Sequence, residues 1–296
     1  MRSHKKQIIV VGTILAIFAL TSALFLLLTS KISIAFDGKR ALKDVYYQIH
    51  LGPRLPGSEA HARTIEWISQ TLNKEGWEIE IQELEADGKP IKNIIAKRGS
   101  GKPWIILGAH YDSRFYADQD PVIENRTLPV PGANDGASGV AVLIELGRVL
   151  PKNLEKQVWL VFFDAEDQGN IPGWDWILGS KAFVNALIDK PDAVVVIDMI
   201  GDKDLNIFQE KNSDPELTRI IWAIAKDSGY ATQFIDQPKY SILDDHYPFL
   251  EKGIPAIDII DFDYPFWHTT GDTIDQVSPN SLSAVGTTLF NWLTQP

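Results

Sequence analysis

The sequence contains no cysteine among its 296 residues. This absence excludes a disulfide framework, a cysteine-ligated zinc site and a thiol nucleophile. It leaves the compartment open, because an exported protein can fold without disulfides.

Basic residues are also scarce, with 28 Lys and Arg against 39 Asp and Glu, a formal net charge of −11. Four of the basic residues (Arg2, Lys5, Lys6 and Lys31) and none of the acids lie in the first 31 positions, so the rest of the chain is more acidic still. An acidic surface repels phosphate backbones, so nucleic acid is not an expected partner. The composition, 45% hydrophobic and 23% charged, is that of a globular protein and excludes a wholly disordered chain.

The stretch from Gln7 to Ser30 carries no charge and is rich in Ile, Leu, Val, Ala and Phe. About 20 apolar residues suffice for a membrane-spanning helix, whereas the apolar region of a signal peptide has about 7–15. We therefore expect a basic cytoplasmic tail (1–6), a transmembrane signal anchor (7–30), a linker (31–43) and a catalytic domain outside the cytoplasm (44–296). The alternative is secretion after cleavage, because Ser33-Ile34-Ala35 resembles a cleavage site.

After Phe36 the apolar spacing predicts two helices, three strands and then strands alternating with helices. Two of the strand-like runs, 158–163 and 194–197, are apolar on both faces, as in parallel sheets that helices cover. The predicted fold is therefore a single three-layer α/β domain with a mixed, mostly parallel central sheet and an antiparallel N-terminal edge. The expected helices are 38–48, 59–73, 136–150, 179–188, 215–229 and 281–293, and the expected strands are 77–84, 91–97, 104–108, 157–163, 193–199 and 256–260.

Polar residues follow several of these strands at the point where each ends. Since the carboxyl ends of parallel strands share one edge of a sheet, where ligands bind, these side chains are expected to converge. They are His110, Asp135, Glu166, Asp167, Asp198 and His268. Zinc accepts His nitrogen and carboxylate oxygen, and acids so crowded favour a divalent cation. The sequence therefore predicts a metal site.

Individual residues in this group have simpler interpretations. Asp135 could merely cap the following helix, and Glu166-Asp167 could be a solvated acidic loop. Because Glu166 and Asp167 are adjacent, however, their side chains diverge, so one can bind metal while the other acts as a base. Asp112 lies two residues after His110 and could accept its far ring N–H.

Together these residues resemble the zinc aminopeptidases of metallopeptidase family 28, and in particular their glutaminyl cyclase relatives. The resemblance extends from about Asp44 to the C-terminus. It is carried by Gly52-Pro53-Arg54, Pro56-Gly57-Ser58, His110-Tyr111-Asp112-Ser113, Asn134-Asp135-Gly136, Glu166-Asp167, Gly179-Ser180, Asp198 and Trp267-His268-Thr269, and, for the cyclase branch, by Asp244-Asp245-His246-Tyr247-Pro248-Phe249-Leu250 with Gly253-Ile254-Pro255.

The resemblance implies cyclisation of N-terminal glutaminyl residues of peptides or proteins to pyroglutamate, with release of ammonia. It implies one zinc ion held by Asp135, Asp167 and His268, with Glu166 transferring a proton. Asp198 and Asp244 would form a hydrogen-bonded acidic pair near the substrate. Aromatic side chains would line the substrate pocket, namely Trp267, Phe266 and either Trp174 or Trp176.

Two alternatives remain open. His110 and Asp198 complete the five-ligand set of the two-zinc aminopeptidases, with Asp135 as the bridge, which implies hydrolysis of N-terminal residues. A non-catalytic ectodomain is the other, although such relatives lose ligands that are all present here. The chain also departs from the cyclase pattern, with Asp167 where many members have Glu and Asp258 where animal cyclases carry His.

Overall fold

The computed structural model describes residues 36–295. The predicted basic tail and signal anchor lie outside these residues. Between 36 and 295, no helix is both long and apolar enough to cross a bilayer. The predicted linker extended to Lys43, but helix α2 (Gly38–Leu51) already begins at Gly38, where Asp37 caps it by accepting the N–H groups of Lys39 and Arg40.

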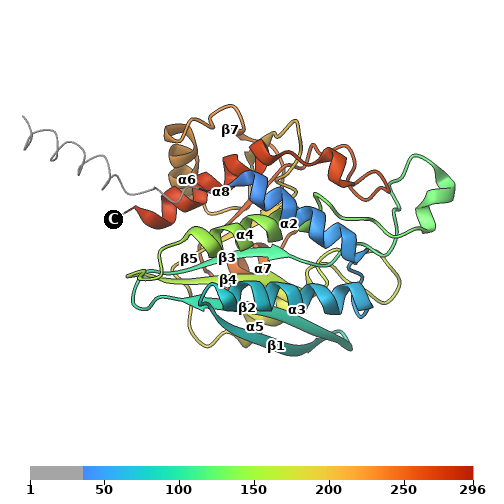
Figure 1. Cartoon of the computed structure of the whole chain (residues 1–296), viewed down its shortest axis with the longest axis horizontal. Coiled ribbons are helices and arrows are strands. Elements are labelled where there is room, and N and C mark those ends of the chain that lie inside the picture. Colours follow the sequence, from blue (N-terminus) through green and yellow to red (C-terminus); the bar gives the residue numbers. More distant parts are fainter. Residues whose placement is uncertain (1–35, 296) are drawn as a thin grey trace, which may run out of the picture. The chain divides into compact units, whose positions relative to one another are not determined.

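A six-stranded sheet forms the middle of the domain, in the order β1-β2-β4-β3-β5-β8 (Figure 1). Its four parallel strands are β3 (Trp104–His110), β4 (Gln157–Phe163), β5 (Ala193–Asp198) and β8 (Ala256–Ile260). At the other edge, β2 (Lys89–Arg98) is antiparallel to both of its neighbours, β4 and β1 (Glu78–Ala86). The predicted α/β domain with an antiparallel N-terminal edge is thus confirmed.

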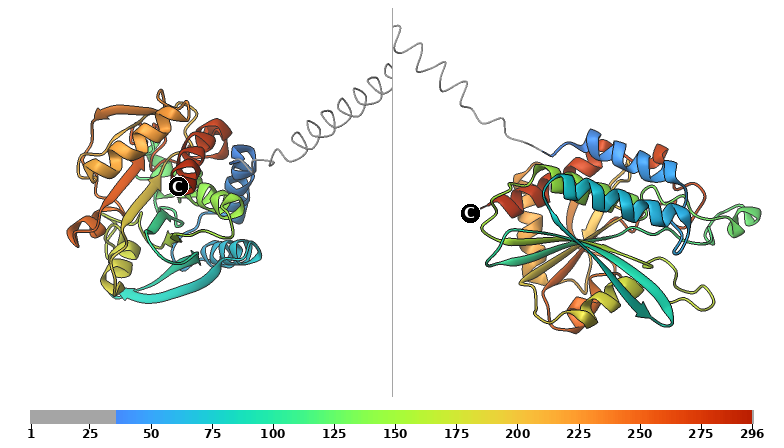
Figure 2. Two further views of the ribbon diagram at one scale, coloured as in Figure 1. Left: turned by 90° about the vertical axis from the view of Figure 1, so that its left-hand side faces the viewer. Right: turned by 60° about the horizontal axis from the view of Figure 1, so that its bottom comes forward.

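Helices cover both faces of this sheet (Figure 2). One face packs against α2, α3 (Glu59–Lys74), α4 (Ala137–Val149), α6 (Pro215–Asp227) and α8 (Pro279–Thr294). The other packs against α5 (Leu178–Ala186) and the short α7 (Tyr247–Glu251).

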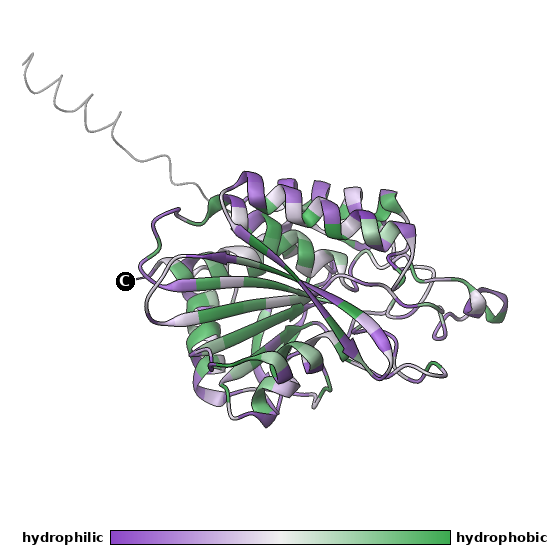
Figure 3. Ribbon diagram, turned by 90° about the horizontal axis from the view of Figure 1, so that it is seen from below, coloured by the Kyte–Doolittle hydropathy of each residue, from purple (hydrophilic) through white to green (hydrophobic). Residues whose placement is uncertain are grey.

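Successive residues of the central strands enter the two different cores, and Figure 3 shows these strands coloured as predominantly hydrophobic. In β5, for example, Val195 and Ile197 belong to one core and Val194 and Val196 to the other. Burial on both faces is the reason that these strands read as continuous apolar runs.

The elements that the sequence did not predict are all short. They are β6 (Ile207–Gln209) and β7 (Phe234–Pro238), which form a separate parallel pair, α7, and the 3-10 turns η1 (Ile123–Thr127) and η2 (Ile274–Gln276). Segments of three to five residues are too short to display an apolar period.

Core packing on α4 provides a test of the fold. Leu146 of α4 is completely buried in the core, whereas Leu128, just after η1, is 48% exposed. Leu146→Ala should lower the free energy of unfolding by about 2–5 kcal/mol, because a cavity adds to the lost transfer energy. Leu128→Ala is the control and should change it by less than about 1 kcal/mol in urea denaturation. Equal effects would contradict this packing.

Candidate metal centre

Two buried groups of metal-type ligands lie at the carboxyl edge of the parallel strands. The first is Asp135, Asp167 and His268, and the second is His110, Asp135 and Asp198. His110 ends β3, Asp198 ends β5, Asp167 follows β4, and Asp135 precedes α4. The structure therefore brings together all five ligand residues predicted from the sequence, from the last residues of β3 and β5 and from the segments that follow β3, β4 and β8.

Asp135 belongs to both groups through different oxygens. Its Oδ1 is 3.1 Å from His110 Nε2, and its Oδ2 is 3.8 Å from His268 Nε2. Asp135 does not cap α4, because the N-cap is Gly136, which has a φ of 87°. Its two carboxylate oxygens thus face two adjacent ligand groups, which is the arrangement of a bridging ligand.

The first group fits a divalent cation. His268 Nε2 is 2.7 Å from Asp167 Oδ1, yet the two atoms are not aligned as a hydrogen bond, and His268 Nε2, Asp135 Oδ2 and Asp167 Oδ2 are all buried without a hydrogen-bond partner. Ligands at 2.0–2.2 Å around one tetrahedral zinc lie about 3.4 Å apart. Unpaired donor atoms converging at this spacing suit an ion with mixed N/O ligation better than a proton.

The acids of this region resist simultaneous ionisation. Burial raises the pKa of Asp198 to about 7, and the nearby Asp135 and Asp244 contribute to this rise. Burial likewise raises the pKa of Glu166 well above its usual range, with Asp244 and Asp167 adding to the effect and His110 opposing it. A cation would relieve this repulsion, whereas a carboxyl with a raised pKa suits proton transfer.

Asp112 fixes the loop that carries Glu166 and Asp167. Its carboxylate accepts the N–H groups of Glu166 (3.1 Å) and Asp167 (3.3 Å) and the side-chain amide of Gln168 (2.9 Å). It also lies 3.3 Å from His110 Nδ1, the contact expected from the sequence. Although burial opposes it, the bonds from His110 and Gln168 lower the pKa of Asp112.

Two further acids hold the first ligand group, and the sequence analysis did not identify them. Asp272 accepts the N–H groups of Asn134 (2.8 Å) and Asp135 (3.1 Å), and Asp118 lies 3.5 Å from His268 Nδ1. Asp272 follows His268 by four residues, so its place after the Trp267-His268 motif was the one available signal. Asp118 had none, because it reaches His268 from a distant loop.

Two buried arginines donate hydrogen bonds to backbone carbonyl oxygens of the same loops. Arg54, fully buried, donates to the carbonyl oxygens of Tyr111 (3.0 Å), Pro131 (3.0 Å) and Gly132 (2.6 Å). Arg114 donates to the carbonyl oxygen of Asp167 at 2.9 Å. These positive charges lie under the acidic groups and offset part of their repulsion.

Three of the six non-glycine residues with positive φ in the described part of the chain belong to this region. Ala165, Met199 and His268 all have positive φ values, of 50°, 48° and 53°. Each lies beside or within the ligand set. Residues other than glycine rarely adopt this backbone conformation. Strained backbone that the surrounding contacts over-determine is typical of functional sites.

A cavity of about 250 Å³ opens onto the first group. Glu166, Asp198, Asp244, Trp176 and Trp267 line it, together with the ligands and with Met199, Tyr240, Ser241, Ile242, Leu243, Ile260 and Phe262. The indoles of Trp267 and Trp176 stack near the His268 ring, with centroids 3.8 and 5.9 Å away.

Two of the predicted pocket aromatics lie elsewhere. Trp174 packs against Phe115 (5.4 Å between centroids) and beneath Lys89, and Phe266 packs against Tyr264 (5.7 Å). Neither lines the cavity. Asp198 and Asp244 both do, but the hydrogen-bond partners of the Asp198 side chain are His110 Nε2 (3.2 Å) and the N–H of Met199 (2.8 Å), and Asp244 Oδ2 has none.

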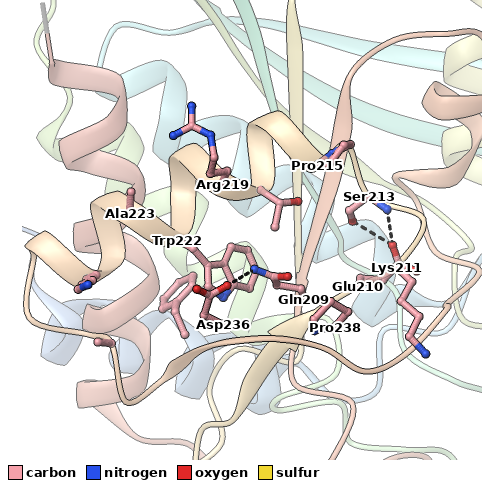
Figure 4. Close-up of a pocket in the computed structure, with 14 residues that line it drawn as sticks. Gln209, Glu210, Lys211, Ser213, Pro215, Arg219, Trp222, Ala223, Asp236 and Pro238 are labelled. Carbon is pink, nitrogen blue, oxygen red and sulfur yellow. Dashed lines mark hydrogen bonds between the residues drawn. The ribbon is translucent and has the colours of Figure 1, made fainter.

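A second cavity, of about 610 Å³, lies between α6 and the β6–β7 pair (Figure 4). Arg219, Trp222 and Phe234 are among its lining residues. None of the metal-type ligands borders it. Size alone therefore does not locate the chemistry, and the smaller acidic cavity is the candidate site.

Residues 93–293 match the model of peptidase family M28, so the chain belongs to this family. Within the family it is similar to glutaminyl cyclases. It is 28% identical over 277 residues to glutaminyl-peptide cyclotransferase of Drosophila melanogaster (79% of this chain, 75% of the relative), and 33% identical to the Porphyromonas gingivalis glutaminyl cyclase structure (TM-score 0.82, 87% of this chain, 98% of that one). These relatives support the glutaminyl cyclase branch of the family.

A structure of a leucine aminopeptidase precursor from Bacteroides thetaiotaomicron is similar to the same degree. It is 31% identical, with a TM-score of 0.84, and the match covers 88% of this chain and 98% of that one. The overall fold therefore does not distinguish a glutaminyl cyclase from an aminopeptidase, and the two must be distinguished by the residues of the site.

Metal content tests the ligand assignment. His268→Ala removes a donor whose Nε2 has no other partner, so we expect the divalent metal bound per purified chain to fall at least tenfold. His50→Ala, at an exposed histidine of α2, is the matched control and should leave metal content unchanged. Full metal occupancy in the His268 variant, measured by elemental mass spectrometry, would overturn the assignment.

Proposed function

We propose that the protein is a zinc-dependent glutaminyl-peptide cyclotransferase, which converts N-terminal glutaminyl residues to pyroglutamate with release of ammonia. The observation that carries the proposal is the convergence, in one cavity, of an unpaired Asp-Asp-His group, a buried Glu166 carboxyl and two tryptophans. The similarity to glutaminyl cyclases supports it.

The reaction needs no nucleophile from the protein, in keeping with a chain that lacks cysteine. The substrate's α-amine attacks its own γ-carboxamide, forming a C–N bond as the C–N bond to the departing ammonia breaks. When bound by Asp135, Asp167 and His268, zinc would polarise the γ-carbonyl and stabilise the developing oxyanion.

Glu166 is placed to move the proton. It follows β4, lines the cavity and has a raised pKa, so it can accept a proton from the α-amine and deliver it to the departing ammonia. Asp198 and Asp244 present carboxyl oxygens to the same cavity and would hold the substrate's amine by hydrogen bonds.

The shape of the cavity favours a single side chain. Its volume of about 250 Å³ is below the range of about 300–1,000 Å³ that is usual for drug-sized ligands. Trp176, Trp267 and Phe262 give it aromatic lining. Such a narrow site would fold one glutaminyl side chain back onto its own amine, and this orientation is itself a large part of catalysis.

Hydrolysis of N-terminal residues by a two-zinc aminopeptidase is the second candidate. The bridging position of Asp135, between His110 and Asp198 on one side and Asp167 and His268 on the other, favours it. Two metal ions there would activate a water molecule in place of the substrate's amine.

We also propose that the catalytic domain works outside the cytoplasm, held at the membrane by residues 7–30. The uncharged length of this stretch and the basic residues before it support the proposal.

A glutaminyl-initiated peptide distinguishes the two reactions. Incubation with the purified, zinc-loaded protein should lower the peptide mass by one ammonia, and the same peptide with N-terminal leucine should stay unchanged. A chelator should abolish the conversion, and added zinc should restore it. Both peptides are followed by mass spectrometry. Release of leucine from the leucine peptide, with no pyroglutamate formed from the glutaminyl peptide, would establish the aminopeptidase reaction instead.

Glu166→Gln tests the proton-transfer role. The amide keeps the size of the side chain but cannot accept the proton, so kcat should fall at least 100-fold while bound zinc is unchanged. Glu124→Gln, at an exposed acid of η1, should leave both values as they are. Activity in the Glu166 variant within threefold of the original would remove Glu166 from this role.

A further inference from the structure

A series of buried polar side chains leads away from the candidate cavity. Asp244 lines that cavity, Asp258 on β8 and His246 lie behind it, and Glu210 after β6 borders the second cavity (Figure 4). Their exposed fractions are 3%, 1%, 0% and 4%. The series thus spans the interior between the two cavities.

Glu210 is the fixed end of the series. Its carboxylate accepts the N–H (2.7 Å) and hydroxyl (2.9 Å) of Ser213 and the N–H of Ile242 (3.0 Å), and it lies 3.2 Å from His246 Nε2. Although burial opposes it, these surroundings, His246 foremost, lower the pKa of Glu210 to about 2. An ionised carboxylate only accepts hydrogen bonds, so Nε2 of His246 carries the hydrogen and its Nδ1 faces the other way.

That other nitrogen faces Asp258. His246 Nδ1 is 4.0 Å from Asp258 Oδ2 and has no hydrogen-bond partner. The N–H of Asp258 donates to the Ser213 hydroxyl (3.0 Å), which itself donates to Glu210. Glu210 therefore holds the backbone of Asp258 through Ser213, and it also holds the His246 ring that faces the Asp258 side chain.

Glu210 also holds the segment that carries Asp244, because Ile242, whose N–H it accepts, and His246 lie two residues to either side of Asp244. The titratable groups that face Asp258 are Asp244, Asp198, Glu210 and His246, and neither carboxylate oxygen of Asp258 has a hydrogen-bond partner. Asp244 Oδ2 has no protein partner and belongs to the cavity lining. It is therefore the oxygen available to a substrate.

Asp258 is a buried acid in β8, a strand that is otherwise apolar, and it opposes the stability of the fold. The remaining residues of β8 are Ala256, Ile257, Ile259 and Ile260. An unsatisfied buried polar atom lowers the stability of a fold, and a well-packed apolar core is commonly at least as stable as buried charge. A purely structural role does not explain an acid here, whereas support for a working carboxylate does.

We propose that Glu210 and His246 are positioning residues, which hold the segment 242–246 in place and so aim the Asp244 carboxylate at the substrate's amine. The proposal rests on the proposed cyclase function and adds two residues to it that do not touch the substrate. Because they act through one another, they form one unit rather than two separate contributions.

Kinetics of Glu210→Gln, His246→Gln and the double variant test this proposal on the full-length, zinc-loaded protein. Each single variant should lower kcat for pyroglutamate formation at least tenfold, with KM within threefold and zinc content unchanged. The double variant should lose no more kcat than the more strongly impaired of the two single variants, because the effects of residues that act as one unit are not additive. Glu216→Gln is the matched control, an exposed acid that pairs with Arg219 at the second cavity, and should change neither constant.

Should either variant fail to fold, as judged by circular dichroism, Ser213→Ala replaces it; this variant removes the hydroxyl that donates to Glu210, and it should also lower kcat. Values of kcat within twofold of the original, multiplicative losses in the double variant, or a loss of kcat that follows loss of zinc would overturn the proposal. Pyroglutamate formation by the unmodified protein is measured in parallel. Its absence would reject the cyclase function itself, a result distinct from active protein with unaffected variants.

Discussion

The crowding of buried carboxyl groups at one edge of a parallel sheet is the constraint on which this structure depends. Asp135, Glu166, Asp167, Asp198 and Asp244 border a single cavity, and burial raises the pKa of three of them, Glu166, Asp167 and Asp198. Such a group persists only if cations, hydrogen-bond donors or shared protons compensate for it. The imidazoles of His110 and His268 and the buried guanidinium of Arg54 are the protein's own contribution, and a metal ion would complete it.

The surroundings of the ligands are built to hold them in place rather than to maximise stability. Asp112 and Asp272 each accept two successive backbone N–H groups, and in this way they fix the loops that carry Asp167 and Asp135. Positive φ values at Ala165, Met199 and His268 are tolerated because these contacts determine the backbone from both sides. Pre-organisation of this kind is what a site needs when charge develops during the reaction.

Much of the architecture could be predicted from local patterns. The apolar runs of β4 and β5 and the amphipathic spacing of α3 reflect burial along a single element, and their predicted bounds agree with the structure within a residue or two. The five ligand residues also came from a local rule, because each follows or ends a strand or precedes a helix at the same sheet edge. The short β6, β7 and α7 were not predicted because three to five residues are too few for a periodic pattern to stand out.

By itself, the sequence determined the α/β class, the parallel core strands and the types of ligand at their ends, since periodic burial and strand order act over short stretches. Only the tertiary structure decided which side chains support them. Asp272 reaches Asn134 across 138 residues, and Asp118 approaches His268 from a loop with no motif of its own. It also decided that Trp176 and not Trp174 lines the cavity, although the two are only two residues apart. The path of a loop depends on packing against distant elements, and no local pattern encodes it.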